Sequence, residues 1–310
     1  MLKILILGSA AGGGSPQWNC NSFVSKAVRN KERGTSPRTQ SSIAVTANND
    51  DWVLFNASPD LGSQILNNKQ MHPKENLRHS PIKGVVLTNG DVDHVAGLLT
   101  LRERQNLSVY AHKRVHSVLN ANSIFNVLNP DYVDRREMDM DHKFEISDKE
   151  GKSLGIEIEA FEVPGKIALW LEDESKGKNF GTESGDTIGL KIFSSSGNES
   201  FYYIPACAKM TAELSNKIKG SEVVLFDGTL WKNDEMATSK VGQKTGSRMG
   251  HMNNSGEDGS IKAFENLGVK RKIFIHINTT NPILLPDSDE RKIVEENGWE
   301  VSYDGMEISI

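Results

Sequence analysis

Length, composition and charge describe an ordinary globular protein. The chain has 310 residues, of which 37% are hydrophobic and 25% are charged, and this balance excludes a disordered or membrane protein. A formal net charge of −5 gives no support for binding to a phosphate backbone, so we expect no nucleic-acid partner. We expect one domain over residues 1–310.

Targeting and membrane signals are not found in the sequence. The first apolar run, residues 2–8, is too short for a secretory signal, and no run has the 18 or more apolar residues of a membrane span. The two cysteines, Cys20 and Cys207, form no spacing pattern, which is typical of a reducing compartment. We therefore expect a cytoplasmic protein. The oligomeric state stays open, with a homodimer as one possibility.

Short β-rich runs recur along the chain and alternate with helical segments. Helical periodicity predicts helices over residues 93–105, 210–220 and 260–268. Residues 300–310 alternate in polarity and predict a closing edge strand or a hairpin. Such a series predicts an αββα sandwich, an α/β fold in which helices cover two sheets. The predicted strands are residues 2–8, 41–48, 52–58, 82–89, 108–112, 156–164, 188–195, 201–206, 222–228 and 272–278.

Two long polar segments interrupt this pattern, at residues 8–40 and 227–260. Both are rich in glycine and contain isolated aromatic residues. Loops of this length in a compact domain are usually functional lids or disordered segments. We expect them to border the active site.

Candidate metal ligands follow three of the apolar strands. Asp93 and His94 come after residues 82–89, Asp227 ends residues 222–227, and His276 lies within residues 272–278. Side chains at strand ends can meet at one rim of a sheet. Two imidazoles with a carboxylate suit a divalent metal, and this set with open positions is typical of Fe(II) sites for O₂ chemistry. The alternative is that each histidine is a core residue and that Asp-Gly at 227–228 is a turn.

The stretch TNGDVDHVAGL, residues 88–98, resembles the H-x-H-x-D-H signature of the metallo-β-lactamase superfamily. Asp93 and His94 match that signature, whereas Asn89 and Asp91 stand where its first two histidines would be. By the same resemblance Lys166 replaces the third histidine of the first metal site. Asp227 matches the bridging aspartate and His276 the late histidine of the family.

Several longer blocks narrow the resemblance to the family of pyrroloquinoline quinone (PQQ) biosynthesis protein B, along nearly the whole chain. They include GSAAGGG at 8–14, PRTQSSIAV at 37–45, VPGKIALWLE at 163–172 and FDGTLW at 226–231. The resemblance implies the αββα fold and an iron-dependent oxygenase that hydroxylates a tyrosine-derived ring. The substrate would come from a precursor that contains Glu and Tyr. The alternatives are a carrier of PQQ or its precursor towards the periplasm, and a metal-dependent hydrolase.

The altered signature predicts that one metal binds, not two. Asn89 is a poor ligand, and the cation of Lys166 stands in place of a ligand nitrogen, with Asp91 as its predicted ion-pair partner. The remaining metal ligands would be Asp93, His94, His276 and Asp227. The predicted cofactor is Fe(II), with O₂ as co-substrate, and Zn(II) could occupy the same site during purification.

Other residues are candidates for supporting roles. Apart from Asp227 and Lys166, the predicted catalytic group contains His251, as a proton donor. Arginine binds carboxylates well, and amides or an indole can orient or flank a ring, although each could be an ordinary surface, turn or core residue. The predicted substrate-binding residues are Arg38, Arg248, Asn278, Asn281 and Trp231.

The amino-terminal loop departs from the family pattern. Relatives often carry Cys-x-Cys-x-x-Cys here, and this chain has Cys20, Ser22 and Ser25. One thiolate cannot complete a tetrahedral zinc site. We expect no structural zinc at Cys20, and other contacts must hold the loop.

Overall fold

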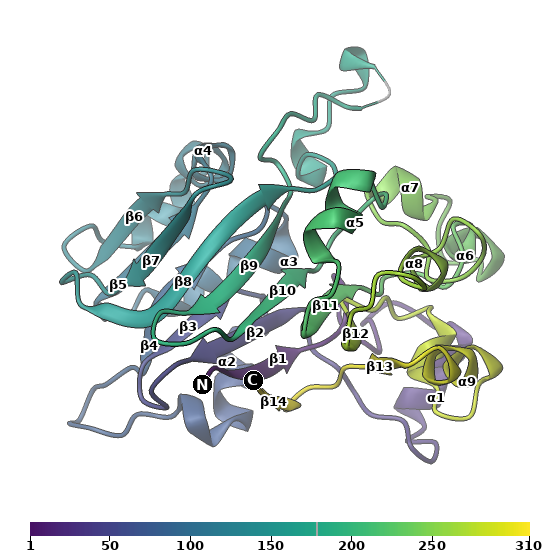
Figure 1. The fold of residues 1–310 in the computed structure, drawn as a ribbon, viewed down its shortest axis with the longest axis horizontal. Helices are drawn as coiled ribbons and strands as arrows, with labels where there is room; N and C mark the ends of the chain where they lie inside the picture. The colour runs from purple at the N-terminus through teal and green to yellow at the C-terminus, as the bar shows by residue number, and fades with distance from the viewer. Residues whose placement is uncertain (178) are drawn as a thin grey trace.

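The computed structural model describes residues 1–177 and 179–310, and its centre is a pair of seven-stranded sheets packed face to face (Figure 1). In the first sheet β3, β4, β5 and β6 run parallel, while β14, β1, β2 and β3 pair antiparallel. Its strands, in spatial order, are β14 (Glu307–Ser309), β1 (Lys3–Gly8), β2 (Ser42–Thr46), β3 (Trp52–Phe55), β4 (Ile82–Val86), β5 (Leu107–Ala111) and β6 (Val133–Glu137).

The second sheet repeats this mixed arrangement. Strands β10, β11, β12 and β13 are parallel, and β7, β8, β9 and β10 pair antiparallel. Its spatial order is β13 (Trp299–Val301), β12 (Arg271–Ile275), β11 (Val223–Asp227), β10 (Ser200–Ile204), β9 (Ile188–Ser194), β8 (Ser153–Glu162) and β7 (Lys143–Ser147).

Helices cover the outer faces of both sheets (Figure 1). The α-helices are α1 (Phe23–Arg29), α2 (Leu61–Asn67), α3 (Val92–Val95), α4 (Lys113–Ala121), α5 (Ala212–Ile218), α6 (Glu235–Thr238), α7 (Gly246–Met249), α8 (Ser260–Ala263) and α9 (Asp289–Glu296). Short 3-10 turns are η1 (Lys69–Met71), η2 (Ala96–Leu101), η3 (Ser123–Val127), η4 (Leu169–Leu171), η5 (Glu174–Lys176) and η6 (Pro282–Leu284). None of the helices in the described part of the chain has the length and apolar character that crossing a membrane requires.

Three clusters of buried apolar side chains hold the layers together. One lies between the two sheets and includes Phe55 and Tyr203. The second fills the space between the first sheet and α2, α3 and α4, and the third packs the second sheet against α1, α5, α8 and α9. This four-layer arrangement confirms the predicted αββα sandwich, because each sheet buries both of its faces.

The element predictions are confirmed for the apolar strands and wrong at several other places. Strands β6 and β7 were not predicted, because VDRRE and KFEIS carry charges where a buried strand would carry apolar residues. The predicted helix over 93–105 is a four-residue α3 followed by the 3-10 turn η2. The carboxyl-terminal segment forms the edge strand β14, as one of its two alternatives predicted, and no hairpin, since β13 and β14 belong to different sheets. The long segments contain α1, α6 and α7.

The parallel strands place the candidate ligands at one rim. Strands β4, β11 and β12 end on the same side of the sandwich, and each is followed directly by a candidate ligand segment. Bridges between Asn89 and Thr187 and between Ala10 and Ile277 join the two sheets at that rim. The carboxyl ends of parallel strands therefore form the floor of a possible site.

A close backbone contact fixes α3 at this rim. The amide of Gly97 donates to the carbonyl of Ala57 at 2.8 Å, and the amide of Ala57 donates to the carbonyl of His94 at 2.7 Å. A Cβ at position 97 would overlap the carbonyl oxygen of Ser58. Glycine therefore permits the approach that positions His94.

We expect Gly97→Ala to lower the free energy of unfolding by about 1–3 kcal/mol, because the added methyl group overpacks against backbone. Gly62→Ala in α2 is the matched control, since its Cβ would meet only Thr100 Cγ2 at 3.9 Å. That control should be neutral or slightly stabilising. Urea unfolding of both variants measures the difference, and equal stabilities would contradict the role given to Gly97.

Candidate metal centre

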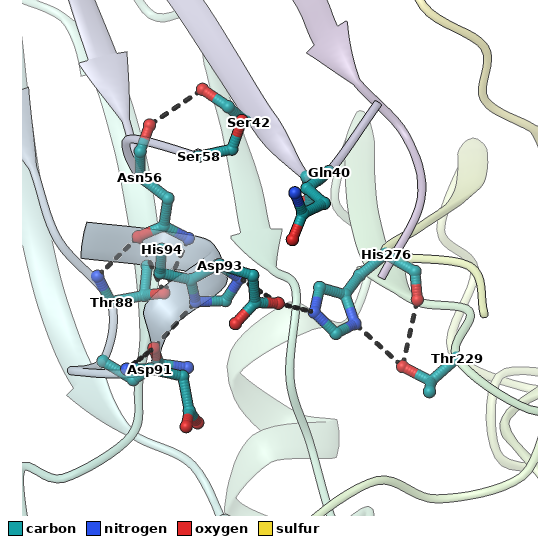
Figure 2. Close-up of polar contacts among 12 residues, drawn as sticks. Gln40, Ser42, Asn56, Ser58, Thr88, Asp91, Asp93, His94, Thr229 and His276 are labelled. Atoms are coloured by element: carbon teal, nitrogen blue, oxygen red, sulfur yellow. Dashed lines mark hydrogen bonds and ion pairs between the residues drawn. The ribbon is translucent and has the colours of Figure 1, made fainter. Parts of the chain in front are cut away.

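Asp93 lies between two buried histidines that come from different sheets. His94 and Asp93 belong to α3, after β4, and His276 directly follows β12. Figure 2 shows the Asp93 carboxylate directed at the His276 ring, with His94 on its other side. The structure thus brings together three of the four residues that the sequence predicted as ligands, across 183 residues of chain, whereas Asp227 groups with His251 and His276.

His94 has one nitrogen bonded and one free. Its side chain is 1% exposed, and Nδ1 lies 2.8 Å from Asn89 Oδ1, an acceptor, so Nδ1 carries the proton. Nε2 has no hydrogen-bond partner among the described residues and lies 3.8 Å from Asp93 Oδ2. Burial lowers the pKa of His94 to about 4, so the ring is neutral near pH 7. A buried lone pair therefore faces Asp93 unused.

His276 is oriented from behind by Thr229 (Figure 2), which is itself bonded to Asp227. The Thr229 hydroxyl donates to Asp227 Oδ1 at 2.6 Å, so it accepts from His276 Nδ1 at 2.9 Å. His276 Nε2 then faces Asp93 Oδ2 at 3.0 Å. Burial opposes a charge on this ring, but the hydrogen bond to Asp93 and its negative charge outweigh burial and raise the pKa of His276.

These atoms fit a divalent metal. The ligand atoms of Asp93, His94 and His276 lie within 4.8 Å of one another. An unpartnered imidazole nitrogen costs free energy when it is buried, and a metal ion at this point would bond to it. The same ion would replace the proton shared by His276 and Asp93. Two neutral imidazoles and one carboxylate suit Fe(II) or Zn(II).

Asp227 already has all of its bonds satisfied. Oδ1 accepts from the amide and hydroxyl of Thr229, and Oδ2 accepts from the amide of Cys207 at 2.9 Å and from His251 Nδ1 at 2.6 Å. Asp227, His251 and His276 form a second group with metal-ligand spacing. The His251 ring stacks on His276 with centroids 5.0 Å apart. Asp227 thus lies behind both histidines, where it orients them.

The three residues that the resemblance aligns with histidines of the first metal site bond to other protein groups, and Lys166 does not pair with Asp91 as predicted. Lys166 Nζ bonds to Glu172 Oε1 at 2.8 Å, so the predicted ion pair between Lys166 and Asp91 is wrong. Asp91 Oδ1 instead accepts from the amide of Leu169 at 3.0 Å. Asn89 Oδ1 accepts from both His94 Nδ1 and the amide of Asp91. Each residue that replaced a histidine now makes a structural bond.

The two predicted carboxylate-binding arginines are bonded to other protein groups. Arg248 forms a bidentate pair with Glu172, at 3.0 and 2.7 Å, and its guanidinium stacks 3.6 Å from the Phe180 centroid. Hydrogen bonds from Arg248 are the main cause that holds the pKa of Glu172 at about 2. Arg38 lies in a different cavity and donates to the carbonyl of Ser302. We therefore withdraw Arg38 from the substrate-binding set.

Of the remaining predicted substrate-binding residues, Asn278 lies at the cavity, whereas Asn281 and Trp231 are buried in the protein. Asn278 lines the cavity beside His276. Asn281 is fully buried and donates to the carbonyl of Gly228 at 2.9 Å, which holds two loops together. Trp231 packs in the cluster beneath the second sheet. Asn281 and Trp231 are placed as structural residues.

A cavity of about 390 Å³ opens above the centre. Apolar side chains of Leu169, Met236 and Met249 form part of its wall. Besides the ligand residues it is lined by Gln17, His251, Lys166 and Lys244. Gln17 and His251 come from the two long segments, so both segments border the site as expected.

Sequence reasoning missed Thr229 and Glu235. Thr229 connects Asp227 to His276, and its position two residues after an aspartate at a strand end was the available signal. Glu235 is 5% exposed and accepts from the amide of Trp231 at 2.6 Å and from Thr280 Oγ1 at 2.5 Å. Burial raises the pKa of Glu235 to about 7. It joins the 227–260 segment to the loop that follows His276.

The amino-terminal loop is held by polar contacts around Cys20. Arg29 donates to the carbonyls of Cys20 and Gln17, and the hydroxyl of Ser22 caps α1. Ser25 Oγ lies 2.8 Å from Thr279 Oγ1, in the loop after His276. These bonds fix the loop around Cys20, Ser22 and Ser25.

Residues 51–277 match the model of a Beta-lactamase superfamily domain. A diphosphatase from the PhnP family superposes with a TM-score of 0.66 over 99% of this chain and 96% of the other, at 18% identity, which shows likeness of fold alone. Fold and matched residues together define a metallo-β-lactamase fold protein.

Full-length relatives narrow the family. Coenzyme PQQ synthesis protein B from Rhodopseudomonas palustris is 48% identical over 311 residues, and that from Xanthomonas campestris pv. campestris is 47% identical over 309, with 100% of each chain covered. The crystal structure of Zn²⁺-bound PqqB from Methylobacterium extorquens superposes with a TM-score of 0.92 at 45% identity, covering 99% of this chain and 100% of that one. The chain belongs to the coenzyme PQQ synthesis protein B family.

We expect His94→Ala and His276→Ala to abolish Zn(II) binding, whereas His251→Ala should retain it, because the free lone pair belongs to His94. Asn89→Ala should weaken Zn(II) binding by about 10–100-fold through loss of the orienting bond. The exposed His142→Ala is the control. Titration calorimetry with Zn(II) measures all five variants, and full affinity in His94→Ala would contradict the ligand set.

Glu235 should make stability depend on pH. Its folded pKa of about 7 exceeds the ordinary 4.5, so the folded state binds the extra proton between these values. The protonated carboxyl group stabilises the fold below pH 4.5. As pH rises through 7, the free energy of unfolding should fall by on the order of 3 kcal/mol. Glu235→Gln should remove this loss. Urea unfolding over this pH range tests it, with the exposed Glu257→Gln as control, and parallel profiles of Glu235→Gln and wild type would contradict it.

Proposed function

We propose that this protein acts in PQQ biosynthesis as a mononuclear non-haem Fe(II) oxygenase that hydroxylates a tyrosine-derived ring of the PQQ precursor. The names of its full-length relatives support the pathway. The observation that carries the chemistry is the free Nε2 of His94, which faces Asp93 and His276 with no protein partner in the described structure.

Support for a single metal comes from the bonds of the replaced ligands. Lys166 is held by Glu172, Asp91 by the amide of Leu169, and Asn89 by His94. A second metal ion would have to displace these contacts and would meet the ammonium group of Lys166. Hydrolases of two-metal type activate water between their metals, and this arrangement lacks that set of ligands in the residues that are described.

Each residue has a separate task in the proposal. Asp93, His94 and His276 would hold Fe(II), which would supply the activation of O₂. Asp227, through Thr229, keeps the proton of His276 on Nδ1 and therefore presents Nε2. His251 has Nδ1 bonded to Asp227, so its other ring nitrogen is the one that can hold or deliver a proton.

The cavity above the centre suits an aromatic ring with polar ends. Leu169, Met236 and Met249 offer apolar contacts, and Asn278 offers a side-chain amide. The proposed role of Lys166 in catalysis is indirect. Its ammonium group is fixed by Glu172, and its positive charge lies beside Asp91.

The decisive assay measures O₂. Protein purified without oxygen, loaded with Fe(II) and given glutamyl-tyrosine with ascorbate as the two-electron donor should consume one O₂ for each hydroxylated product, because one oxygen atom enters the ring and the other leaves as water. His251→Ala should keep bound iron and slow turnover by about 10²–10⁴-fold, the range of general acid–base catalysis. Zn(II)-loaded protein is the control and should consume no O₂, because zinc does not change its oxidation state.

Two results would contradict this function. Cleavage of phosphodiester or lactam substrates under argon would indicate a hydrolase of the same fold. Tight binding of PQQ or its precursor without O₂ uptake by the Fe(II) protein would indicate a carrier.

A further inference from the structure

We infer that Lys244 binds a carboxylate group of the substrate and so determines which tyrosine derivatives the site accepts. The inference rests on the proposed function, because it takes a substrate with carboxylate groups from that proposal. Lys244 takes the carboxylate-binding role that the sequence suggested for Arg38 and Arg248, because both arginines are bonded to other protein groups.

Two cations at or near the cavity are already bonded to protein, Lys166 in its lining and Arg248 outside it. Lys166 and Arg248 both bond to Glu172, and together they use both of its oxygens. A cation that already shares a carboxylate in a good geometry would have to exchange that bond to bind a ligand. Lys166 and Arg248 are therefore poor candidates to bind a substrate.

Lys244 differs from both of these cations. It lines the same cavity as Asp93, His94 and His276, and its ammonium group has no ion-pair or hydrogen-bond partner in residues 1–177 and 179–310. It has three N–H donors and no competing acceptor within the described protein. Lys244 is the cavity-lining ammonium that can bind a ligand without breaking a protein contact.

The backbone around Lys244 is fixed although its side chain is free. The amide of Gly242 donates to the carbonyl of Met236 at 3.2 Å, and the amide of Gly246 donates to the carbonyl of Asn233 at 2.8 Å. Thr245, the next residue, caps α7 by accepting from the amide of Arg248. The backbone of Lys244 is thus held by hydrogen bonds on both sides. Only its side chain has to become ordered when a ligand binds.

Charge near the centre decides which part of the substrate lies at Lys244. Asp91 and Asp93 line the inner cavity, and their two negative charges offset those of a bound divalent ion, so the loaded centre offers no net positive charge to a carboxylate. The neutral ring is the part that can approach the ligand residues. The carboxylates of a glutamyl or tyrosyl part then lie towards the remaining cation, which is Lys244.

Binding to the Zn(II)-loaded protein tests this assignment without turnover. The probes are glutamyl-tyrosine and its analogue with every carboxyl group amidated, measured by titration calorimetry. Lys244→Met should weaken binding of the acid about tenfold, the effect of one charge-assisted hydrogen bond, and leave the amide within twofold. Lys244→Arg should restore most of the affinity for the acid.

Lys232→Met is the matched control, because Lys232 is an exposed lysine of the same 227–260 segment outside this cavity. It removes the same charge and should leave both affinities unchanged. Equal Zn(II) content in all variants shows that the centre is intact.

Acid binding that survives Lys244→Met, or that falls equally in Lys232→Met, would overturn the assignment while the oxygenase proposal stands. Wild-type protein that binds neither probe would contradict the proposed substrate class, and the assignment with it. Binding that behaves as expected without O₂ uptake by the Fe(II) protein would support Lys244 and contradict the oxygenase.

Discussion

The hydrogen bond between Asn89 Oδ1 and His94 Nδ1 is the contact on which the centre depends. It fixes the proton on Nδ1. The lone pair is therefore on Nε2, which is buried and has no hydrogen-bond partner in the described residues. Asn89 also accepts from the amide of Asp91, so one side chain sets both the tautomer and the turn that begins α3. Asn89, which the resemblance aligns with a metal-binding histidine, thus orients His94, a predicted ligand.

Asp91 and Lys166 make bonds that hold the segment between β8 and β9. This segment projects from the body of the molecule (Figure 1). Asp91 binds the amide of Leu169, and Glu172 joins Lys166 to Arg248 of α7. The negative charge of Glu172 is stable because two cations share it, which is why its pKa is about 2. The residues that the resemblance aligns with the first metal site therefore hold a wall of the cavity.

The sequence was informative wherever a pattern is local. Apolar runs predicted most strands, and Asp93, His94 and His276 could be predicted as ligands because each follows a buried strand. Partners set by tertiary structure could not be predicted. Arg38 binds the backbone of Ser302, 264 residues away, and Glu172 lies in a segment without periodicity. Strands β6 and β7 were not predicted, because their charged residues interrupt the alternation of apolar and polar residues that indicates a strand.

The most direct test is a crystal of the Fe(II)-loaded protein, grown without oxygen and measured for anomalous scattering at the iron edge. The account predicts one peak per chain, within coordination distance of His94 Nε2, His276 Nε2 and an oxygen of Asp93. A peak among Asn89, Asp91 and Lys166, or two peaks in each chain, would contradict it.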